Sequence, residues 1–76
     1  LSYMETPPIP SDPLLRWEWL KYQLRSKGSS FSGIAKELGV TRQTIGRARV
    51  IAYPRIQHAI ASKLGLEPHV IWPERY

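Results

Sequence analysis

Residues 30–48 of the chain, SFSGIAKELGVTRQTIGRA, decide the fold. Ser30 can cap a helix, because its hydroxyl can accept a hydrogen bond from a free amide of the first helical turn. The apolar residues that follow it recur at spacings of three and four, which predicts a helix over residues 31–38 with one inward face. Gly39 ends this helix, since glycine adopts the left-handed conformation without a steric penalty.

A second helix is expected after a very short turn. Thr41 is a good N-cap, so this helix begins at Arg42. Ala35 must be small because the second helix crosses over it at close range, and Gly39 permits the sharp turn. Two helices joined in this way are typical of a helix-turn-helix, although the same apolar pattern also fits an ordinary three-helix core.

Three more helices are predicted around this motif. Asp12 followed by Pro13 is a helix-start signal, because the carboxylate can accept from free amides and proline needs no donor in the first turn. This helix is expected to run to Lys27, with another over residues 54–64 and a short one over residues 68–72. Because no strand pattern occurs, the expected fold class is all-α with five helices.

The composition limits what kind of protein this is. With 76 residues and no cysteine, the chain forms one small domain that only packed apolar side chains can stabilise. A multidomain enzyme, a disulfide framework and a thiolate metal site are therefore excluded. Four prolines fall within residues 1–13, so we expect a flexible arm over residues 1–11 and the helical domain over residues 12–76.

Positive charge is concentrated in the middle of the chain. The net charge is +5, but residues 16–63 hold ten basic and two acidic residues, which gives that stretch a charge of +8. A basic balance indicates an anionic partner such as nucleic acid, although a solvated surface is often basic as well. The positions of the charges must decide between the two.

The outward face of the helix that begins at Thr41 is chemically suited to reading DNA. Gln43 and Arg47 are four residues apart and so share a face; glutamine can bond bidentately to adenine and arginine to guanine. We predict that these two residues read bases. Further contacts, mainly with phosphates, are expected from Ser30, Lys36, Thr41, Arg42, Thr44 and Arg49.

Two features of this helix have a second interpretation. Arg42 and Arg49 fit a solvated helix face as well as phosphate contacts. Gly46 either admits DNA closely or is a tolerated cost of about 1 kcal/mol inside a helix.

Two blocks carry a family resemblance: residues 30–48 and residues 53–76, YPRIQHAIASKLGLEPHVIWPERY. They resemble the Ner family, the small DNA-binding repressors of Mu-like transposable phages and their bacterial Ner-like (Nlp) relatives, whose terminal signature is similar to IWPERY. The resemblance implies a compact five-helix, lambda-repressor-like domain that binds operator DNA as a pair of subunits. It also implies repression of phage early transcription, including transposase expression. Gly46 and the run RARVIAY, residues 47–53, depart from the family's pattern.

We therefore expect a sequence-specific transcriptional regulator that binds a double-stranded DNA operator as a homodimer. With no apolar run of membrane-spanning or signal-peptide length, it is expected in the cytoplasm of a bacterial or phage-infected cell, associated with the nucleoid. No enzymatic activity, cofactor, small-molecule substrate or membrane partner is expected. A bound metal is not expected either, since His58 and His69 have no third ligand. The other hypothesis is a protein-interaction module in which Trp19 and Tyr22 bind a polymerase or transposase subunit.

Overall fold

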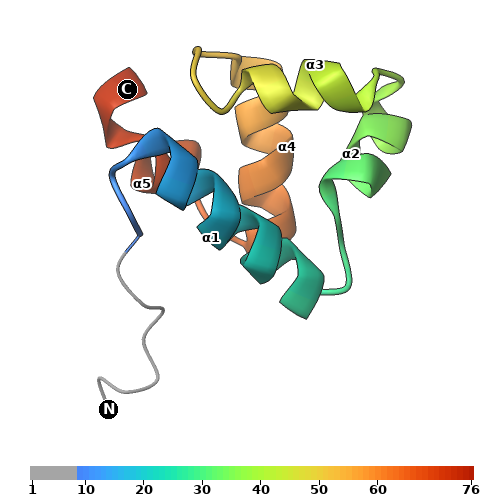
Figure 1. Cartoon of the computed structure of the whole chain (residues 1–76), viewed down its shortest axis with the longest axis horizontal. Helices are drawn as coiled ribbons and strands as arrows, with labels where there is room; N and C mark the ends of the chain where they lie inside the picture. Colours follow the sequence, from blue (N-terminus) through green and yellow to red (C-terminus); the bar gives the residue numbers. More distant parts are fainter. Residues whose placement is uncertain (1–8) are drawn as a thin grey trace.

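The structure is a computed structural model that describes residues 9–76. Its elements are α1 (Pro13–Ser26), α2 (Phe31–Leu38), α3 (Arg42–Arg47), α4 (Pro54–Leu64), α5 (Pro68–Ile71) and the 3₁₀ helix η2 (Pro73–Arg75). Figure 1 shows α3 running across one end of α4, with α1 in front and α2 to one side. Residues 9–76 contain no β-strand, which confirms the all-α class with five α-helices. The last α-helix ends at Ile71, one residue before the predicted Trp72, and Pro73 begins η2, which the sequence did not indicate.

The ends of α1 show how local sequence sets the helix boundaries. Asp12 Oδ2 accepts hydrogen bonds of 3.1 and 3.0 Å from two amides of the first turn, as its N-cap position predicts. Gly28 turns the chain at the other end with φ +75°. Lys27 is the C-cap and α1 ends at Ser26, so the prediction of a helix to Lys27 was one residue too long.

One apolar core joins all five α-helices. The rings of Trp17 and Phe31 stack with centroids 4.2 Å apart, which connects α1 to the first residue of α2. Trp72 is 1% exposed and fills the core as predicted, whereas Val40, predicted to be buried, is half-buried at its edge. The buried apolar residues are Trp17, Leu20, Leu24, Phe31, Ile34, Ala35, Ile45, Ala48, Ile56, Ile60, Ala61, Leu64, Ile71 and Trp72.

Two buried polar side chains tie the C-terminal segment to the rest of the domain. Arg16, which is 2% exposed, donates to both carboxylate oxygens of Glu74 at 3.1 and 2.5 Å and to the carbonyl of Ile71 at 3.1 Å. The hydrogen bonds from Arg16 lower the pKa of the Glu74 carboxyl. Gln57, 1% exposed, donates to the hydroxyl of Tyr76 at 3.2 Å. Because a buried polar group needs its partners, these bonds fix where the segment lies.

The predicted arm, residues 1–11, lies largely outside the described residues. Within the described part, Ile9 packs half-buried against the core. The division into an arm and a domain that begins at residue 12 stays a prediction.

Candidate nucleic-acid interface

The turn between α2 and α3 sets the direction of α3. Gly39 has φ +72°, and the amide of Val40 donates to the carbonyl of Ala35 at 3.0 Å, which closes the end of α2. Ala35 is 5% exposed, and α2 and α3 pack against each other. On α3 itself, Ile45 is fully buried, as is Ala48 just beyond the helix, so the opposite side of α3 must face outward.

The outward side of α3 borders an open hollow of about 640 Å³. The predicted base readers Gln43 and Arg47 are both exposed and both line it. The predicted phosphate contacts Arg42 and Arg49 line the same hollow, which is completed by Trp17, Gly46 and Val50. The structure therefore brings four of the eight predicted DNA-contacting residues onto one concave surface.

Gly46 lies in this hollow with free space around it. A Cβ built on Gly46 would have no heavy atom within 4 Å, and the residue is not among those with positive φ. Neither internal packing nor backbone conformation therefore requires a glycine at this position. This geometry is consistent with the interpretation that Gly46 lets DNA approach α3 closely.

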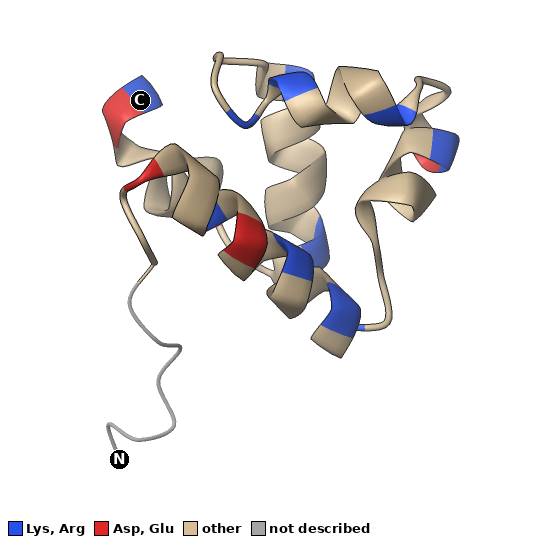
Figure 2. Cartoon of the chain, in the orientation of Figure 1, with Lys and Arg blue, Asp and Glu red and all other residues tan. Residues whose placement is uncertain are grey.

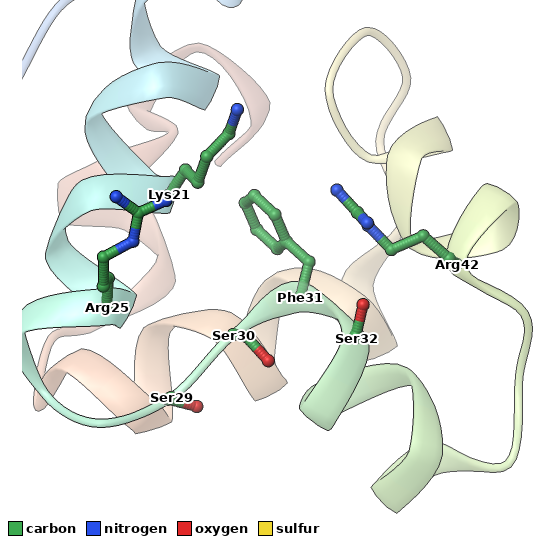
Figure 3. Close-up of a pocket in the computed structure, with 7 residues that line it drawn as sticks. All are labelled: Lys21, Arg25, Ser29, Ser30, Phe31, Ser32 and Arg42. Atoms are coloured by element: carbon green, nitrogen blue, oxygen red, sulfur yellow. The ribbon is translucent and has the colours of Figure 1, made fainter.

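A second hollow, of about 270 Å³, lies at the beginning of α2 (Figure 3). Lys21 and Arg25 reach it from α1, and Arg42 reaches it from α3. The ring of Phe31 lies between them, with the Cζ atom of Arg42 5.9 Å from the ring centroid. The other lining residues are Ser29, Ser30 and Ser32.

The second hollow is strongly positive. Among the ion pairs of residues 9–76, neither Arg25 nor Arg42 has a carboxylate partner, and Lys21 has only Glu18 at 3.4 Å. The first amides of a helix also carry partial positive charge, and α2 begins here. Arg42 lines both hollows, so the positive surface continues from the start of α2 to the outward side of α3.

Of the remaining predicted contacts, Ser30 lines the second hollow, whereas Thr41 and Thr44 line neither. Ser30 Oγ accepts from the amide of Gly33 at 2.9 Å, and Thr41 Oγ1 accepts from the amide of Thr44 at 3.1 Å, so both hydroxyls cap helices. The hydroxyls of Thr41 and Thr44 lie 3.0 Å apart. Lys36 is exposed on α2 but lines neither hollow.

Part of the basic charge counted in the sequence has partners within the protein. Arg16, one of the ten basic residues of the stretch 16–63, is buried and pairs with Glu74. Arg55 donates to the carbonyl of Leu38 at 2.9 Å, and Lys63 pairs with Glu37 at 2.9 Å. The other cations of this stretch lie on α1, α2 and α3 or beside these helices, as Figure 2 shows. Five of these cations line the two hollows: Lys21, Arg25, Arg42, Arg47 and Arg49.

Sequence reasoning did not assign Lys21 and Arg25 to the site. It counted them only toward the net charge, although their spacing of four residues places them on one face of α1. Nothing local indicates that this face meets the start of α2, because that contact depends on how the helices pack.

The proposed protein-binding face on α1 is smaller than expected. Trp19 packs half-buried against the core and so covers its edge. Tyr22 is 64% exposed, as are Leu14 (60%) and Leu15 (62%) near the beginning of the helix. Trp19 is thus largely used by the fold, and the alternative rests mainly on Tyr22.

The described residues offer no other obvious kind of site. In residues 9–76 no three His, Asp or Glu side chains gather in a way that could hold a metal ion. None of the described helices has the length and apolar character needed to cross a membrane.

Comparison with known proteins also indicates DNA binding. Residues 17–76 match the profile of a family described as winged helix-turn-helix DNA-binding. Over 53 residues the chain is 38% identical to the sugar fermentation stimulation protein B of Escherichia coli K12, covering 70% of this chain and 58% of that protein. Residues 9–76 form no strand, so the wing in the family's description is absent from this part of the chain.

Two further relatives are phage or prophage proteins. The chain is 32% identical over 54 residues to the Mu-like prophage FluMu DNA-binding protein Ner of Haemophilus influenzae, covering 71% of this chain and 61% of that protein. It is also 32% identical over 54 residues to the negative regulator of transcription of Escherichia phage D108, covering 71% and 74%. For the Escherichia coli protein, in contrast, the match spans little more than half of that protein's length.

Proposed function

This chain belongs to the winged helix-turn-helix DNA-binding family, and we propose that it is a sequence-specific repressor of transcription that reads double-stranded operator DNA with α3. Relatives named Ner and negative regulator of transcription confirm the resemblance to the Ner family. The proposal includes repression of phage-type early genes, transposase expression among them, in the cytoplasm of a bacterial or phage-infected cell. It assigns the chain no catalytic role and no cofactor.

The observation that carries this proposal is the outward side of α3. An α-helix fits the major groove of B-form DNA, where each base pair presents a distinct pattern of donors and acceptors. Gln43 and Arg47 stand on this side of α3, exposed and free of any role in the core. We assign them to base edges, where each bidentate pair would contribute about 1–3 kcal/mol of discrimination.

The hollow at the start of α2 supports a contact with the phosphate backbone. When a helix enters the major groove, a phosphate strand lies directly beside it, and Arg42 connects α3 to this hollow. We assign Lys21, Arg25 and Arg42 to phosphates together with Ser30. Such contacts set affinity and position on the duplex and do not select the sequence.

The proposal includes binding as a pair of subunits. One small domain presents a single recognition helix, and two copies on half-sites about 34 Å apart, one turn of the duplex, would multiply its affinity. The expected operator is therefore an inverted repeat. Hydroxyl-radical footprinting on a selected duplex should show two protected half-sites with this spacing; a single protected half-site bound by one copy would contradict pairing.

The experiment that tests the function is selection of bound duplexes from a random-sequence library at moderate salt. The proposal predicts one enriched motif. Binding of that selected duplex and of a scrambled duplex of the same composition is then measured for Gln43→Ala, Arg47→Ala and Arg25→Ala. The first two should lose preference for the selected duplex, whereas Arg25→Ala should weaken both duplexes alike and reduce the salt dependence by about one phosphate contact.

Two matched variants complete this experiment. Lys36→Ala removes a cation that is exposed on α2 and should weaken both duplexes alike. Lys63→Ala removes the same charge from α4, where it pairs with Glu37 away from both hollows, and should change neither. If no motif is enriched, or if all these variants lose affinity equally on both duplexes, the assignment of α3 to base reading is wrong.

A further inference from the structure

A side chain from the end of the protein sequence caps the end of α3. Arg75 Nη1 donates to the carbonyl of Ala48 at 2.8 Å, and Nη2 donates to the carbonyl of Arg49 at 3.2 Å. Ala48 is the C-cap of α3, and Arg75 belongs to η2, 26 and 27 residues further along the chain. The guanidinium therefore bonds two consecutive carbonyls just where the recognition helix ends.

The arginine is itself held in place. Its side chain is 9% exposed, its Nε lies 3.7 Å from the Glu74 carboxylate, and its Cζ lies 5.8 Å from the centroid of the Trp72 ring. Glu74 in turn receives both guanidinium nitrogens of Arg16, whose side chain is 3% exposed. A buried anchor in α1 thus fixes the acid that lies beside the capping arginine.

The end of α3 needs such a partner. A helix of six residues is far below the length at which a helix is stable on its own, and its last carbonyls have no amide partner within the helix. Beyond it, the amides of Arg49 and Val50 reach back only three residues, at 3.1 and 3.2 Å, which is tighter 3₁₀ geometry. Gly46 weakens the same turn, because glycine gains the most backbone freedom on unfolding.

We infer that Arg75 is a positioning residue for DNA recognition. It acts through the backbone of Ala48 and Arg49, holding the last turn of α3 and with it the side chains of Arg47 and Arg49. The planar guanidinium holds its donors in a rigid fork that bonds the two neighbouring carbonyls, whereas the ammonium of lysine is a flexible point charge, so lysine should replace arginine poorly here. The inference rests on the proposed function for its DNA part, but the capping itself is a property of the free protein.

The test begins with amide hydrogen exchange in the free protein, wild type and the variants Arg75→Met and Arg75→Lys. In Arg75→Met the amides of Arg49, Val50 and Ile51 should exchange at least about tenfold faster, because the variant loses both hydrogen bonds that the charged guanidinium donates. Amides in the middle of α4, such as that of Ile60, should stay near their wild-type rates. Arg75→Lys should fall between the two, since it keeps the charge but can bond only one carbonyl well.

A second arginine provides the matched control for exchange. Arg55 donates to the carbonyl of Leu38 near the end of α2, so Arg55→Met should speed exchange at Gly39 and Val40 and leave residues 49–51 unchanged. If Arg75→Met leaves residues 49–51 at wild-type rates, or speeds every amide in the protein equally, Arg75 does not hold the end of α3 and the inference is overturned.

The DNA part compares the same variants on the duplex that wild type selects from a random library and on its scrambled counterpart. The ratio of the two affinities should fall about tenfold in Arg75→Met, and it should fall in Arg75→Lys as well, although that variant keeps the charge. A wild-type ratio in Arg75→Lys would mean that the charge alone matters and would overturn the positioning role. If wild type itself selects no sequence, the proposed function fails, while the exchange result still decides whether Arg75 holds α3.

Discussion

Replacing Gly46 by alanine should make the protein more stable and its DNA binding weaker. Gly46 is in the last turn of α3, it is not at positive φ, and a Cβ there meets nothing within 4 Å. Alanine should therefore fit without strain and stabilise the helix by about 0.5–1 kcal/mol, since it loses less backbone freedom than glycine on folding. For a domain of this size, that corresponds to a rise in Tm of about 2–8 °C.

The same methyl group would stand in the hollow that Gln43 and Arg47 line. If DNA approaches the backbone of α3 closely at this point, the methyl moves the helix outward and weakens at least one base contact. A contact of this kind is worth about 1–3 kcal/mol, so affinity for the selected duplex should fall about 5- to 150-fold. Binding is measured by fluorescence anisotropy on the selected duplex, and stability by thermal unfolding of the free protein.

A stabilising change elsewhere separates the two effects. Ser62 is exposed on α4, and Ser62→Ala should raise the stability by about 0.5 kcal/mol without changing DNA binding. A Gly46→Ala protein that is less stable than wild type would show that the open space around Gly46 has been misjudged. A stable Gly46→Ala protein with wild-type affinity would show that DNA does not come close to α3 at this residue.

Three further predictions concern an N-cap, the core and the ion pair of Arg16 with Glu74. Thr41→Ala should cost about 1 kcal/mol in the free energy of unfolding because the amide of Thr44 loses its acceptor, and Thr41→Ser should restore most of it; urea unfolding measures both. Ile45→Val should cost about 0.5–1.5 kcal/mol by the same assay, because Ile45 is fully buried. The pKa of Glu74 is lowered in the folded protein, so its stabilising effect is present above the pKa of unfolded glutamate, about 4.3, and is lost as the pH falls through the lower folded value. Wild type should therefore exceed Glu74→Gln in stability at neutral pH, and this gap should close as the pH is lowered below 4; a gap independent of pH would contradict the role of the carboxylate charge.

The features that the sequence predicted correctly are local. An N-cap acts on amides two or three residues away, so Asp12, Ser30 and Thr41 could each be recognised from a few neighbouring letters. The same holds for Gly39, whose positive φ follows from its position after a run of apolar residues with helical spacing. The placement of Gln43 and Arg47 on the outward side of α3 followed from helical periodicity alone.

The features that the sequence did not predict depend on partners far along the chain. Arg16 was counted only as one of the basic residues, because its partner Glu74 is 58 residues away and only the packing of α1 against the C-terminal segment brings them together. The role of Arg75 is hidden for the same reason, because its acceptors lie 26 and 27 residues before it. The ending IWPERY could be recognised as similar to a signature of the Ner family, but the sequence alone did not show which residues this segment contacts.

The positions of the basic side chains argue for DNA more strongly than their number does. A solvated basic surface would spread its charges over all helices, with acidic residues among them. In this protein Arg16, Arg55 and Lys63 are bonded to other groups of the chain, away from the two hollows. The hollows, in contrast, gather Lys21, Arg25, Arg42, Arg47 and Arg49.

Arg42 is the residue on which this argument turns, because it alone lines both hollows. In a DNA duplex the phosphate backbone borders the major groove. Arg42 would lie at that border, between a phosphate strand at the start of α2 and the base edges under α3. A protein partner would have no reason to match that pairing of an anion-binding hollow with an exposed glutamine and arginine, Gln43 and Arg47, about one helix turn apart. The arrangement is therefore better suited to double-stranded DNA than to a merely acidic protein surface.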